Sequence, residues 1–405
     1  MFKNKKAKKW IRARHLVTRN ILCILLKPYA TLKYGLKVKK FKEQGKRPYL
    51  ILFNHQTPFD QFFVGMAFKG SVYYLATEDI FSLGWISSVI RYLVAPIPIK
   101  KQTTDVRAIL NCIKVAHEGG TIAIAPEGNR TYSGRTEYMN PSISHLVRKL
   151  GLPLALYRIE GGYGAEPRWS DVVRKGTMRA YVAEVIEPDE YAKMTDEELI
   201  RRIELALYVN EAKADVKFCH KKLAEYLERA IYVCPECGLS IFESKNDLIE
   251  CKKCGRIVRY HPTKELSGEG FDLQFKFVAD WYDYQREYVN SLDVLAYTDE
   301  PMYRESAEVS EVIPYVKKVK ISKNATVSLY GDRIELDIER ENLVFTFDET
   351  LAVTVLGRNK LNVYHRGRIY QLKGSKRFNA LKYVHIYNRH KNITQGDENV
   401  KLLGI

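Results

Sequence analysis

Acidic residues are almost absent from the first fifty positions of this chain, where Glu43 alone faces sixteen lysines and arginines. That segment therefore carries +15 of the total formal charge of +17, which leaves +2 for residues 51–405. A strongly basic protein is a candidate for nucleic-acid binding. Here the charge is confined to one segment, which also has few aromatic residues for stacking on bases, so we expect no nucleic-acid partner.

A long apolar run is also missing from this segment. The apolar stretch between His15 and Tyr34 is interrupted by cations and falls short of the roughly 20 residues that span a bilayer. No small-residue cleavage site accompanies it, so we expect no secretory signal. Following a basic tail at 3–14, the pattern predicts a basic amphipathic helix on an anionic membrane surface, peripheral on the cytoplasmic face of the cell membrane. The alternative is a helix packed on the domain with a solvated basic face.

A histidine and a carboxylate lie close together in the polar segment 54–60, which follows a buried-strand pattern at 49–53. Thr57 suits the N-cap of a helix, which would place Asp60 in the first turn behind His55. From there the carboxylate can fix the imidazole tautomer and raise the basicity of the other ring nitrogen. The pair would then be a general base for a substrate hydroxyl. Alternatively, Asp60 only satisfies backbone N–H groups in a capping box.

A second polar turn follows the apolar strand at 121–125 and has the sequence Pro-Glu-Gly-Asn-Arg-Thr at 126–131. Gly128 permits a tight turn, and Arg130 offers a planar fork of donors suited to phosphate. An α/β sheet places its site where polar turns follow apolar strands. The alternative is a surface turn with a solvated arginine.

The two segments together resemble motifs of the glycerolipid acyltransferase family, typified by 1-acylglycerol-3-phosphate acyltransferases. The first family motif, Asn-His-x4-Asp, is matched by Asn54, His55 and Asp60. The third, Pro-Glu-Gly-Thr-Arg-Ser, is matched at 126–131, with Asn129 and Thr131 as departures. Because both motifs occur in order and at family-like spacing, they are more specific together than either is alone.

The other two family motifs are matched less well. The second normally ends in a phosphate-binding arginine, where this chain has Lys100 and Lys101. The fourth is an apolar strand with a proline, which residues 152–156 resemble only in part. The resemblance covers roughly residues 15–215. The departures from the family motifs leave the identity of the acyl acceptor open more than the type of reaction.

The resemblance implies an O-acyltransferase of phospholipid biosynthesis that moves a fatty acyl group from acyl-CoA or acyl-ACP to lysophosphatidate, giving phosphatidate. His55 would take the hydroxyl proton, Asp60 would orient His55, and Arg130 would hold the phosphate. Glu127 would bond an acceptor hydroxyl or pair with Arg130. We expect no covalent acyl-enzyme, because neither motif places a serine or cysteine where His55 could activate it. The further substrate-binding candidates are Asn54, Lys100, Lys101, Glu127, Gly128, Asn129 and Thr131.

Two other functions remain open at this point. The acceptor would be glycerol 3-phosphate, dihydroxyacetone phosphate or another lysolipid in one of them. In the other, the acyltransferase-like domain would be inactive, and the chain would serve as a scaffold on the membrane.

The seven cysteines fall into two groups. Cys23, Cys112 and Cys219 are scattered through helical patterns, and we expect them to be small buried apolar residues. The other four form two Cys-x-x-Cys-Gly knuckles separated by thirteen residues, which is zinc-ribbon spacing. Four thiolates would close the shell of a structural Zn²⁺, and the alternative is two disulfides or a redox pair. The predicted ligands are Cys234, Cys237, Cys251 and Cys254.

Element patterns divide the chain into five parts. The fold class is an α/β acyltransferase-like domain, then a small zinc ribbon, then an all-β domain that resembles a pleckstrin-homology or GRAM module with a C-terminal helix. The boundaries are 1–46 for the membrane segment, 47–230 for the acyltransferase domain, 231–260 for the ribbon, 261–300 for a linker with an aromatic helix and 301–405 for the β module.

The individual elements follow from apolar periodicity. In the first domain, strands are expected at 49–53, 71–76, 93–99, 121–125, 153–159 and 178–186, and helices at 58–69, 80–92, 104–118, 141–150 and 195–230. In the second half, helices are expected at 275–288 and 376–390, and strands at 313–320, 326–330, 333–338, 343–347, 351–356, 361–365 and 368–372.

Overall fold

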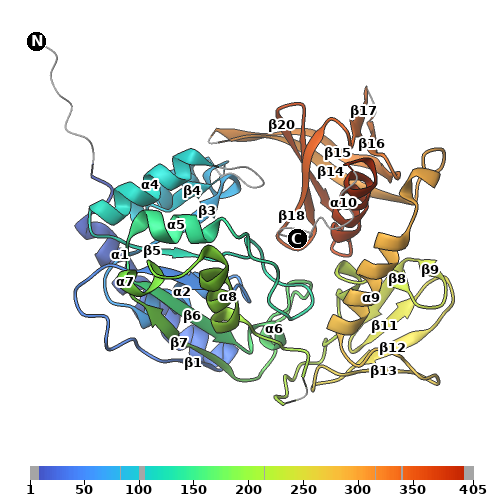
Figure 1. The fold of residues 1–405 in the computed structure, drawn as a ribbon. Coiled ribbons are helices and arrows are strands. Elements are labelled where there is room, and N and C mark those ends of the chain that lie inside the picture. Colours follow the sequence, from blue (N-terminus) through green and yellow to red (C-terminus); the bar gives the residue numbers. More distant parts are fainter. Residues whose placement is uncertain are drawn as a thin grey trace, which may run out of the picture.

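The computed structural model of the chain describes residues 9–82, 84–99, 105–213, 215–314, 316–338 and 341–395. Its first half is an α/β domain, and its second half combines a small cysteine-containing module with a larger β module (Figure 1). The α/β prediction is confirmed.

A seven-stranded sheet forms the centre of the α/β domain, in the order β1-β7-β6-β2-β5-β3-β4. All neighbours pair in parallel except β6 and β7, which are antiparallel. The central strands β2 and β5 are buried along their whole length, as expected for a parallel sheet covered on both faces. The strands are β1 (Leu36–Val38), β2 (Leu50–Phe53), β3 (Val72–Thr77), β4 (Ile97–Ile99), β5 (Thr121–Ile124), β6 (Leu154–Glu160) and β7 (Met178–Ile186).

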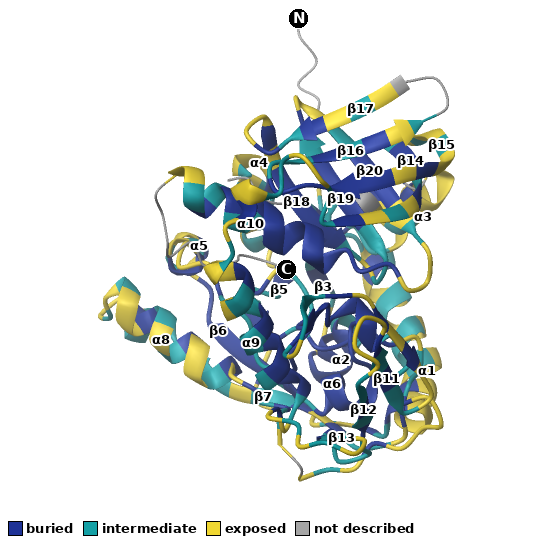
Figure 2. Cartoon of the chain, turned by 90° about the vertical axis from the view of Figure 1, so that its right-hand side faces the viewer, coloured by how far each residue is buried: buried dark blue, intermediate teal, exposed yellow. Residues whose placement is uncertain are grey.

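Helices cover both faces of this sheet. Buried residues of α1 and α2 form one apolar cluster with the strands, and those of α4, α5 and α8 form another. Along α8, buried residues alternate with exposed ones at helical spacing (Figure 2). The helices are α1 (Ala13–Tyr34), α2 (Asp60–Ala67), α3 (Trp85–Leu93), α4 (Val106–His117), α5 (Ile143–Leu150), α6 (Gly162–Ala165), α7 (Pro188–Tyr191) and α8 (Asp196–Leu207), with a short 3₁₀ helix η1 (Glu78–Ser82) before α3.

The first helix ends where the chain must turn sharply into the sheet. Gly35 has φ of +59°, and a Cβ there would lie 2.0 Å from the carbonyl oxygen of Gly176, so only glycine fits. Among the described residues, no helix combines the length and apolar character that crossing a bilayer requires.

Two predicted elements of this domain are wrong. The helix expected at 195–230 ends at Leu207, and the chain then crosses irregularly to the second half. Its apolar residues no longer follow one helical face there, and Phe218 instead fills a space above Gly164 and Gly176. The strand expected at 93–99 is limited to β4, because α3 continues to Leu93.

The cysteine module (Val233–Gly268) contains a hairpin of β8 and β9 and an antiparallel sheet in the order β10-β11-β12-β13. Helix α9 (Val278–Ser291) lies between it and the β module, where the aromatic helix was expected. The strands are β8 (Val233–Cys234), β9 (Gly238–Leu239), β10 (Phe242–Lys245), β11 (Leu248–Cys251), β12 (Ile257–Tyr260) and β13 (Leu266–Gly268), and η2 (Leu227–Arg229) precedes them.

The β module (Tyr303–Gln395) is a curled antiparallel sheet in the order β17-β16-β15-β14-β20-β19-β18, with α10 packed against it. The strand expected at 313–320 spans the turn between β14 and β15. Strand β14 itself was not predicted, because most of its residues are polar. Its elements are η3 (Val294–Ala296) just before it, then β14 (Tyr303–Ile313), β15 (Lys317–Leu329), β16 (Arg333–Ile338), β17 (Glu341–Thr346), β18 (Thr350–Leu356), β19 (Lys360–His365), β20 (Arg368–Gly374) and α10 (Leu381–Gln395).

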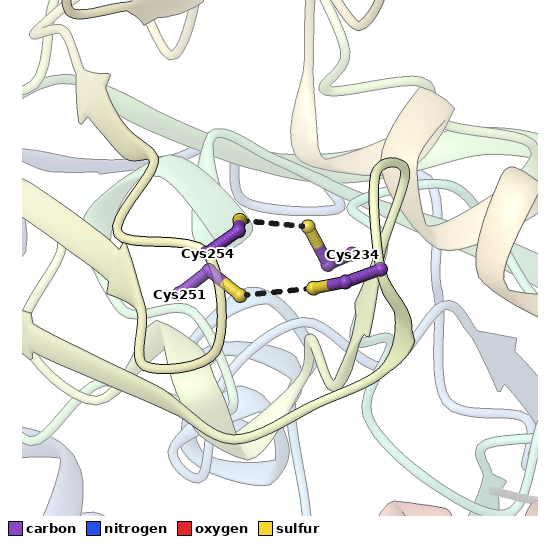
Figure 3. A group of neighbouring side chains, drawn as sticks. Cys234, Cys251 and Cys254 are labelled. Carbon is purple, nitrogen blue, oxygen red and sulfur yellow. Dashed lines mark hydrogen bonds between the residues drawn. The ribbon is translucent and has the colours of Figure 1, made fainter.

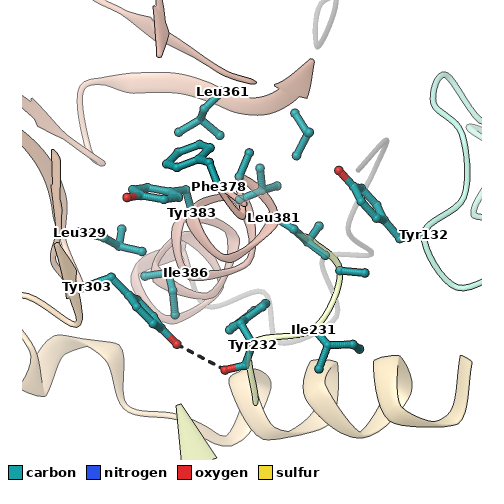
Figure 4. Packing of buried hydrophobic residues seen from close by; sticks show 14 of the residues in the cluster. Tyr132, Ile231, Tyr232, Tyr303, Leu329, Leu361, Phe378, Leu381, Tyr383 and Ile386 are labelled. Atoms are coloured by element: carbon teal, nitrogen blue, oxygen red, sulfur yellow. Dashed lines mark hydrogen bonds between the residues drawn. The ribbon is translucent and has the colours of Figure 1, made fainter. Parts of the chain in front are cut away.

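One buried core connects the two halves of the chain. Tyr132 and Trp169 of the α/β domain belong to the same apolar cluster as Tyr232, Leu361 and Phe378 (Figure 4). Segments on both sides of β6 are therefore packed against the β module.

Candidate active site

The two predicted polar turns meet at one edge of the sheet. The first follows β2 and the second follows β5, and these strands are parallel neighbours with Leu52 paired to Ile124. Because parallel strands end at the same edge, the turns at 54–60 and 126–131 lie side by side.

His55 and Asp60 are in hydrogen-bond contact, with Nδ1 of His55 lying 2.8 Å from Oδ2 of Asp60. Asp60 is fully buried and also accepts the backbone N–H of Gln56 at 2.6 Å and the hydroxyl of Thr57 at 2.7 Å. It therefore anchors the turn and orients the imidazole at the same time. With Nδ1 donating to Asp60, Nε2 is the ring nitrogen left to accept a proton.

The N-cap prediction for Thr57 is wrong. Phe59 occupies the N-cap of α2, with no side-chain cap, and the helix begins at Asp60. The carboxylate of Asp60 turns back toward Thr57, whose hydroxyl in turn accepts the N–H of Phe59 at 3.1 Å. The Thr57 hydroxyl thus bonds within the turn and does not cap the N–H groups of α2.

Glu127 joins the two turns through backbone groups. Its Oε1 accepts the N–H of His55 at 2.8 Å, and its Oε2 accepts the N–H of Glu137 at 2.9 Å. The side chain is buried, and burial raises its pKa to about 8 despite these two N–H groups. Glu127 thus connects the loop that carries His55 to the loop that carries Glu137. Among the described contacts, Arg130 is not one of its hydrogen-bond partners.

Arg130 lies at the edge of the same site. Its Nη1 atom is enclosed and has no hydrogen-bond partner among the described residues. Burial, with a smaller contribution from the positive charges of Arg168 and Arg358, lowers the pKa of Arg130 to about 10. An enclosed guanidinium with an unused donor is suited to binding an anion.

Only some of the remaining candidate residues line the cavity that contains His55 and Arg130. Glu127, Gly128 and Asn129 line it. Asn54 instead forms two hydrogen bonds with the backbone of Ile159, at 2.8 and 2.7 Å, which fix the turn to β6. Thr131 is buried and its hydroxyl caps the following turn at Ser133 and Gly134. Lys100 and Lys101, together with the basic residues before position 9, lie outside the described residues.

The cavity has a volume of about 1610 Å³, which exceeds the roughly 300–1000 Å³ usual for small-molecule sites. Beyond the polar end at His55 and Arg130, its walls are mainly apolar and come mostly from the first five helices and from β3. Representative apolar lining residues are Leu22, Phe62, Met66, Val89 and Leu93. The arrangement offers a base and a cation at one end of a space that can hold a hydrocarbon chain.

Several residues at this site were not predicted from the sequence. Glu137 bonds to Glu127 through its backbone, and Arg168 lies on the segment between α6 and β7, outside both motifs. Leu356 and Gly357 belong to the β module and nevertheless line the cavity. No sequence pattern marks these contacts, because each depends on the packing of distant segments.

The four predicted metal ligands converge in the cysteine module (Figure 3). Sγ of Cys234 lies 3.7 Å from Sγ of Cys254, and Sγ of Cys237 lies 3.5 Å from Sγ of Cys251. A tetrahedron with Zn–S bonds of about 2.3 Å has sulfurs about 3.8 Å apart, so the group fits Zn²⁺. A disulfide needs about 2.05 Å, which excludes cystines in this arrangement.

The other three cysteines differ from one another. Cys112 is buried as expected, but Cys23 is only partly buried and Cys219 is exposed. Cys219 was assigned to the helix that ends early, and it instead pairs with Lys175 in an isolated bridge. The prediction of a buried apolar role is therefore wrong for Cys219.

Comparison with known proteins finds a family model that matches part of the α/β domain. Residues 35–156 match the model of the Acyltransferase family, and both polar turns fall within this range. The match confirms the resemblance seen in the two motifs for this part of the chain.

Sixteen solved chains match this chain, and one of them is a named acyltransferase. It is the 1-acyl-sn-glycerophosphate (LPA) acyltransferase PlsC from Thermotoga maritima, with 21% identity, a TM-score of 0.40, and coverage of 49% of this chain and 80% of that one. No curated protein matches the chain.

Proposed function

We propose that this protein transfers a fatty acyl group from a thioester, acyl-CoA or acyl-ACP, to the hydroxyl of a lysophosphatidate-like acceptor. The observation that supports this most is the contact between His55 and Asp60 in the same cavity as Arg130. A base and an anion-binding cation at one end of an apolar space match the three parts of such an acceptor: hydroxyl, phosphate and chain.

In the proposed reaction, Nε2 of His55 takes the acceptor hydroxyl proton as the oxygen attacks the thioester carbonyl. The tetrahedral intermediate then expels the thiolate, which receives that proton from the imidazolium. Asp60 stabilises the charged imidazole and holds its orientation. Arg130 holds the acceptor phosphate and so brings the hydroxyl to His55.

The apolar part of the cavity would hold the hydrocarbon chains. Most of its lining beyond the end at His55 is apolar, so acyl chains would be buried there largely against hydrocarbon. Lys100 and Lys101 remain candidates for additional phosphate contacts, as does Asn129 at the cavity wall.

A membrane surface is the proposed location of the enzyme. Helix α1 exposes apolar side chains such as Ile24 and Leu32, and α3 exposes Trp85. The two helices lie together, since Arg14 of α1 donates to the carbonyl oxygen of Tyr92 at 2.7 Å. With the excess of cations in the first fifty residues, these apolar side chains favour peripheral attachment to an anionic bilayer.

The second half of the chain has proposed structural roles. Zn²⁺ held by the four cysteines would fasten a module whose strands are too short to form a large core. The curled sheet with α10 has the element order of a pleckstrin-homology or GRAM module, and we propose that likeness without assigning it a lipid ligand.

The test is a lipid-product assay with purified full-length protein, acyl-CoA and acyl-ACP as donors, and a panel of acceptors. We expect phosphatidate from lysophosphatidate. Transfer only to glycerol 3-phosphate or to an uncharged lysolipid would replace the acceptor. Absence of transfer to every acceptor would favour the scaffold role.

A further inference from the structure

The turn between β18 and β19 reaches into the candidate active site from the β module. Leu356 and Gly357 in this turn line the same cavity as His55 and Arg130. The polar end of the cavity is therefore built by two separate sheets, only one of which contains strands from the range 35–156 that matches the acyltransferase family.

Arg168 connects this turn to the phosphate-binding candidate. Its Nη1 donates to the carbonyl oxygen of Arg130 at 3.0 Å, and its Nη2 donates to that of Val355 at 3.2 Å. The guanidinium also lies over the ring of Tyr132, 4.4 Å from its centroid. Because the side chain is buried, these contacts fix the distance between Arg130 and the turn.

The other side of the turn is held by ion pairs. Arg358 pairs with Glu166 and lies 3.4 Å from Asp171, both on the segment that follows α6. Glu166 also accepts a hydrogen bond from the hydroxyl of Tyr34 at the end of α1. The turn thus contacts the α/β domain at Arg168 and at Arg358, and Val355 before it belongs to the buried cluster that also contains Tyr132 and Trp169.

Charge at this end of the cavity favours an anion with more than one negative charge. Arg130 and Arg168 both line this end of the cavity, whereas Arg358 does not line it and is paired with Glu166. A phosphate monoester carries close to two negative charges at neutral pH, whereas a phosphodiester carries one. A phosphodiester lysolipid also has a further head group, which would extend toward the side that the turn occupies.

We infer that the β18–β19 turn is a wall of the acceptor head-group site and selects phosphate-monoester acceptors over phosphodiester lysolipids. Arg168 acts in this selection as a positioning residue, since it holds Arg130 and the turn in a fixed relation. The inference rests on the proposed function, because it assigns specificity to the same site.

The experiment compares two substitutions on β18 in full-length protein. Leu356→Ala removes a side chain that lines the cavity, whereas Leu351→Ala removes an exposed one that does not. Both are made in the His55→Ala background, so that binding is measured without turnover. Calorimetry with short-chain lysophosphatidate and short-chain lysophosphatidylethanolamine gives the ratio of the two dissociation constants.

We expect the preference for lysophosphatidate to fall about tenfold in Leu356→Ala and to stay unchanged in Leu351→Ala. In a third variant, Arg168→Gln, affinity for lysophosphatidate should fall while affinity for acyl-CoA is retained. An equal ratio in the two leucine variants would overturn the inference.

A transfer assay with the otherwise wild-type protein separates this inference from the proposed function. Selective binding without any transfer would contradict the proposed reaction and leave the wall in place. Transfer to lysophosphatidate with no change of preference in Leu356→Ala would contradict the wall alone.

Discussion

Glu127 accepts the backbone N–H of His55 at 2.8 Å through a buried carboxyl group. Each residue belongs to a different sequence motif, and the bond joins the turns that follow two neighbouring strands. The position of the candidate base therefore depends on a residue from the turn that carries Arg130.

This relationship gives a pH dependence of stability. The pKa of Glu127 is raised by burial from 4.5 to about 8, so the folded protein keeps a proton that the unfolded chain has lost. The contribution to the free energy of unfolding is complete below about pH 4.5 and is lost as pH rises through about 8. Urea unfolding of Glu127→Gln between pH 5 and 9 should show a smaller decline than the wild type.

The same variant should be less stable at pH 5 by about 1–3 kcal/mol, because the hydroxyl oxygen of the protonated carboxyl group can still accept an N–H, whereas the amide nitrogen of glutamine cannot. Curves that stay parallel across the pH range would contradict the raised pKa. Since other groups titrate identically in both proteins, the difference between the curves is the informative quantity.

Arg130→Lys should weaken acceptor binding more than catalysis. Lysine keeps the charge but loses the planar pair of donors, and hydrogen bonds to charged groups contribute about 1.5–3 kcal/mol. Steady-state kinetics should show an acceptor KM raised about tenfold or more, with the donor KM unchanged. Arg107→Lys, an exposed position on α4, is the matched control. An unaltered acceptor KM would remove the phosphate role.

Metal removal should destabilise the second half of the chain. We expect one zinc per chain by elemental analysis, and a Tm lowered by several degrees after chelation, because structural zinc contributes folding energy. Cys251→Ser should lose the metal, whereas Cys219→Ser, at an exposed cysteine outside the cluster, should keep it. A wild-type protein free of metal, with a Tm indifferent to chelator, would refute the site.

Membrane attachment is tested on the outer face of α1. Ile24 and Leu32 are 72% and 85% exposed, and replacing both by serine should lower binding to anionic vesicles about tenfold or more. Leu205→Ser on α8, 67% exposed, serves as control. Deleting the basic tail, residues 1–14, should lower binding in a salt-sensitive way. Equal sedimentation of all variants with vesicles would place the contact elsewhere.

The parts that could be predicted from the sequence are those governed by local pattern. Apolar runs located β2 and β5, and because parallel strands end at one edge, the motifs of His55 and Arg130 were expected together. The bond from His55 to Glu127 could not be anticipated, since its donor is a backbone group that every residue carries.

Long-range packing explains most of what was missed. The contact of Arg168 with Val355 joins segments far apart in the chain, and nothing near either residue marks it. Strand β14 was missed because only one of its sides is buried, so it contains few apolar residues. Val309 and Val312 are two of them, and both are buried. The helix after Thr195 had a correct start, with its capping box present, but its end depends on tertiary contacts.

Acyl transfer to lysophosphatidate by purified His55→Ala protein is the decisive measurement, with folding followed in parallel by Tm. Because His55 is the proposed base, turnover should fall at least about 10²-fold while the Tm stays close to that of the wild type. Turnover near the wild-type level in the folded variant would show that the imidazole held by Asp60 does not carry the reaction.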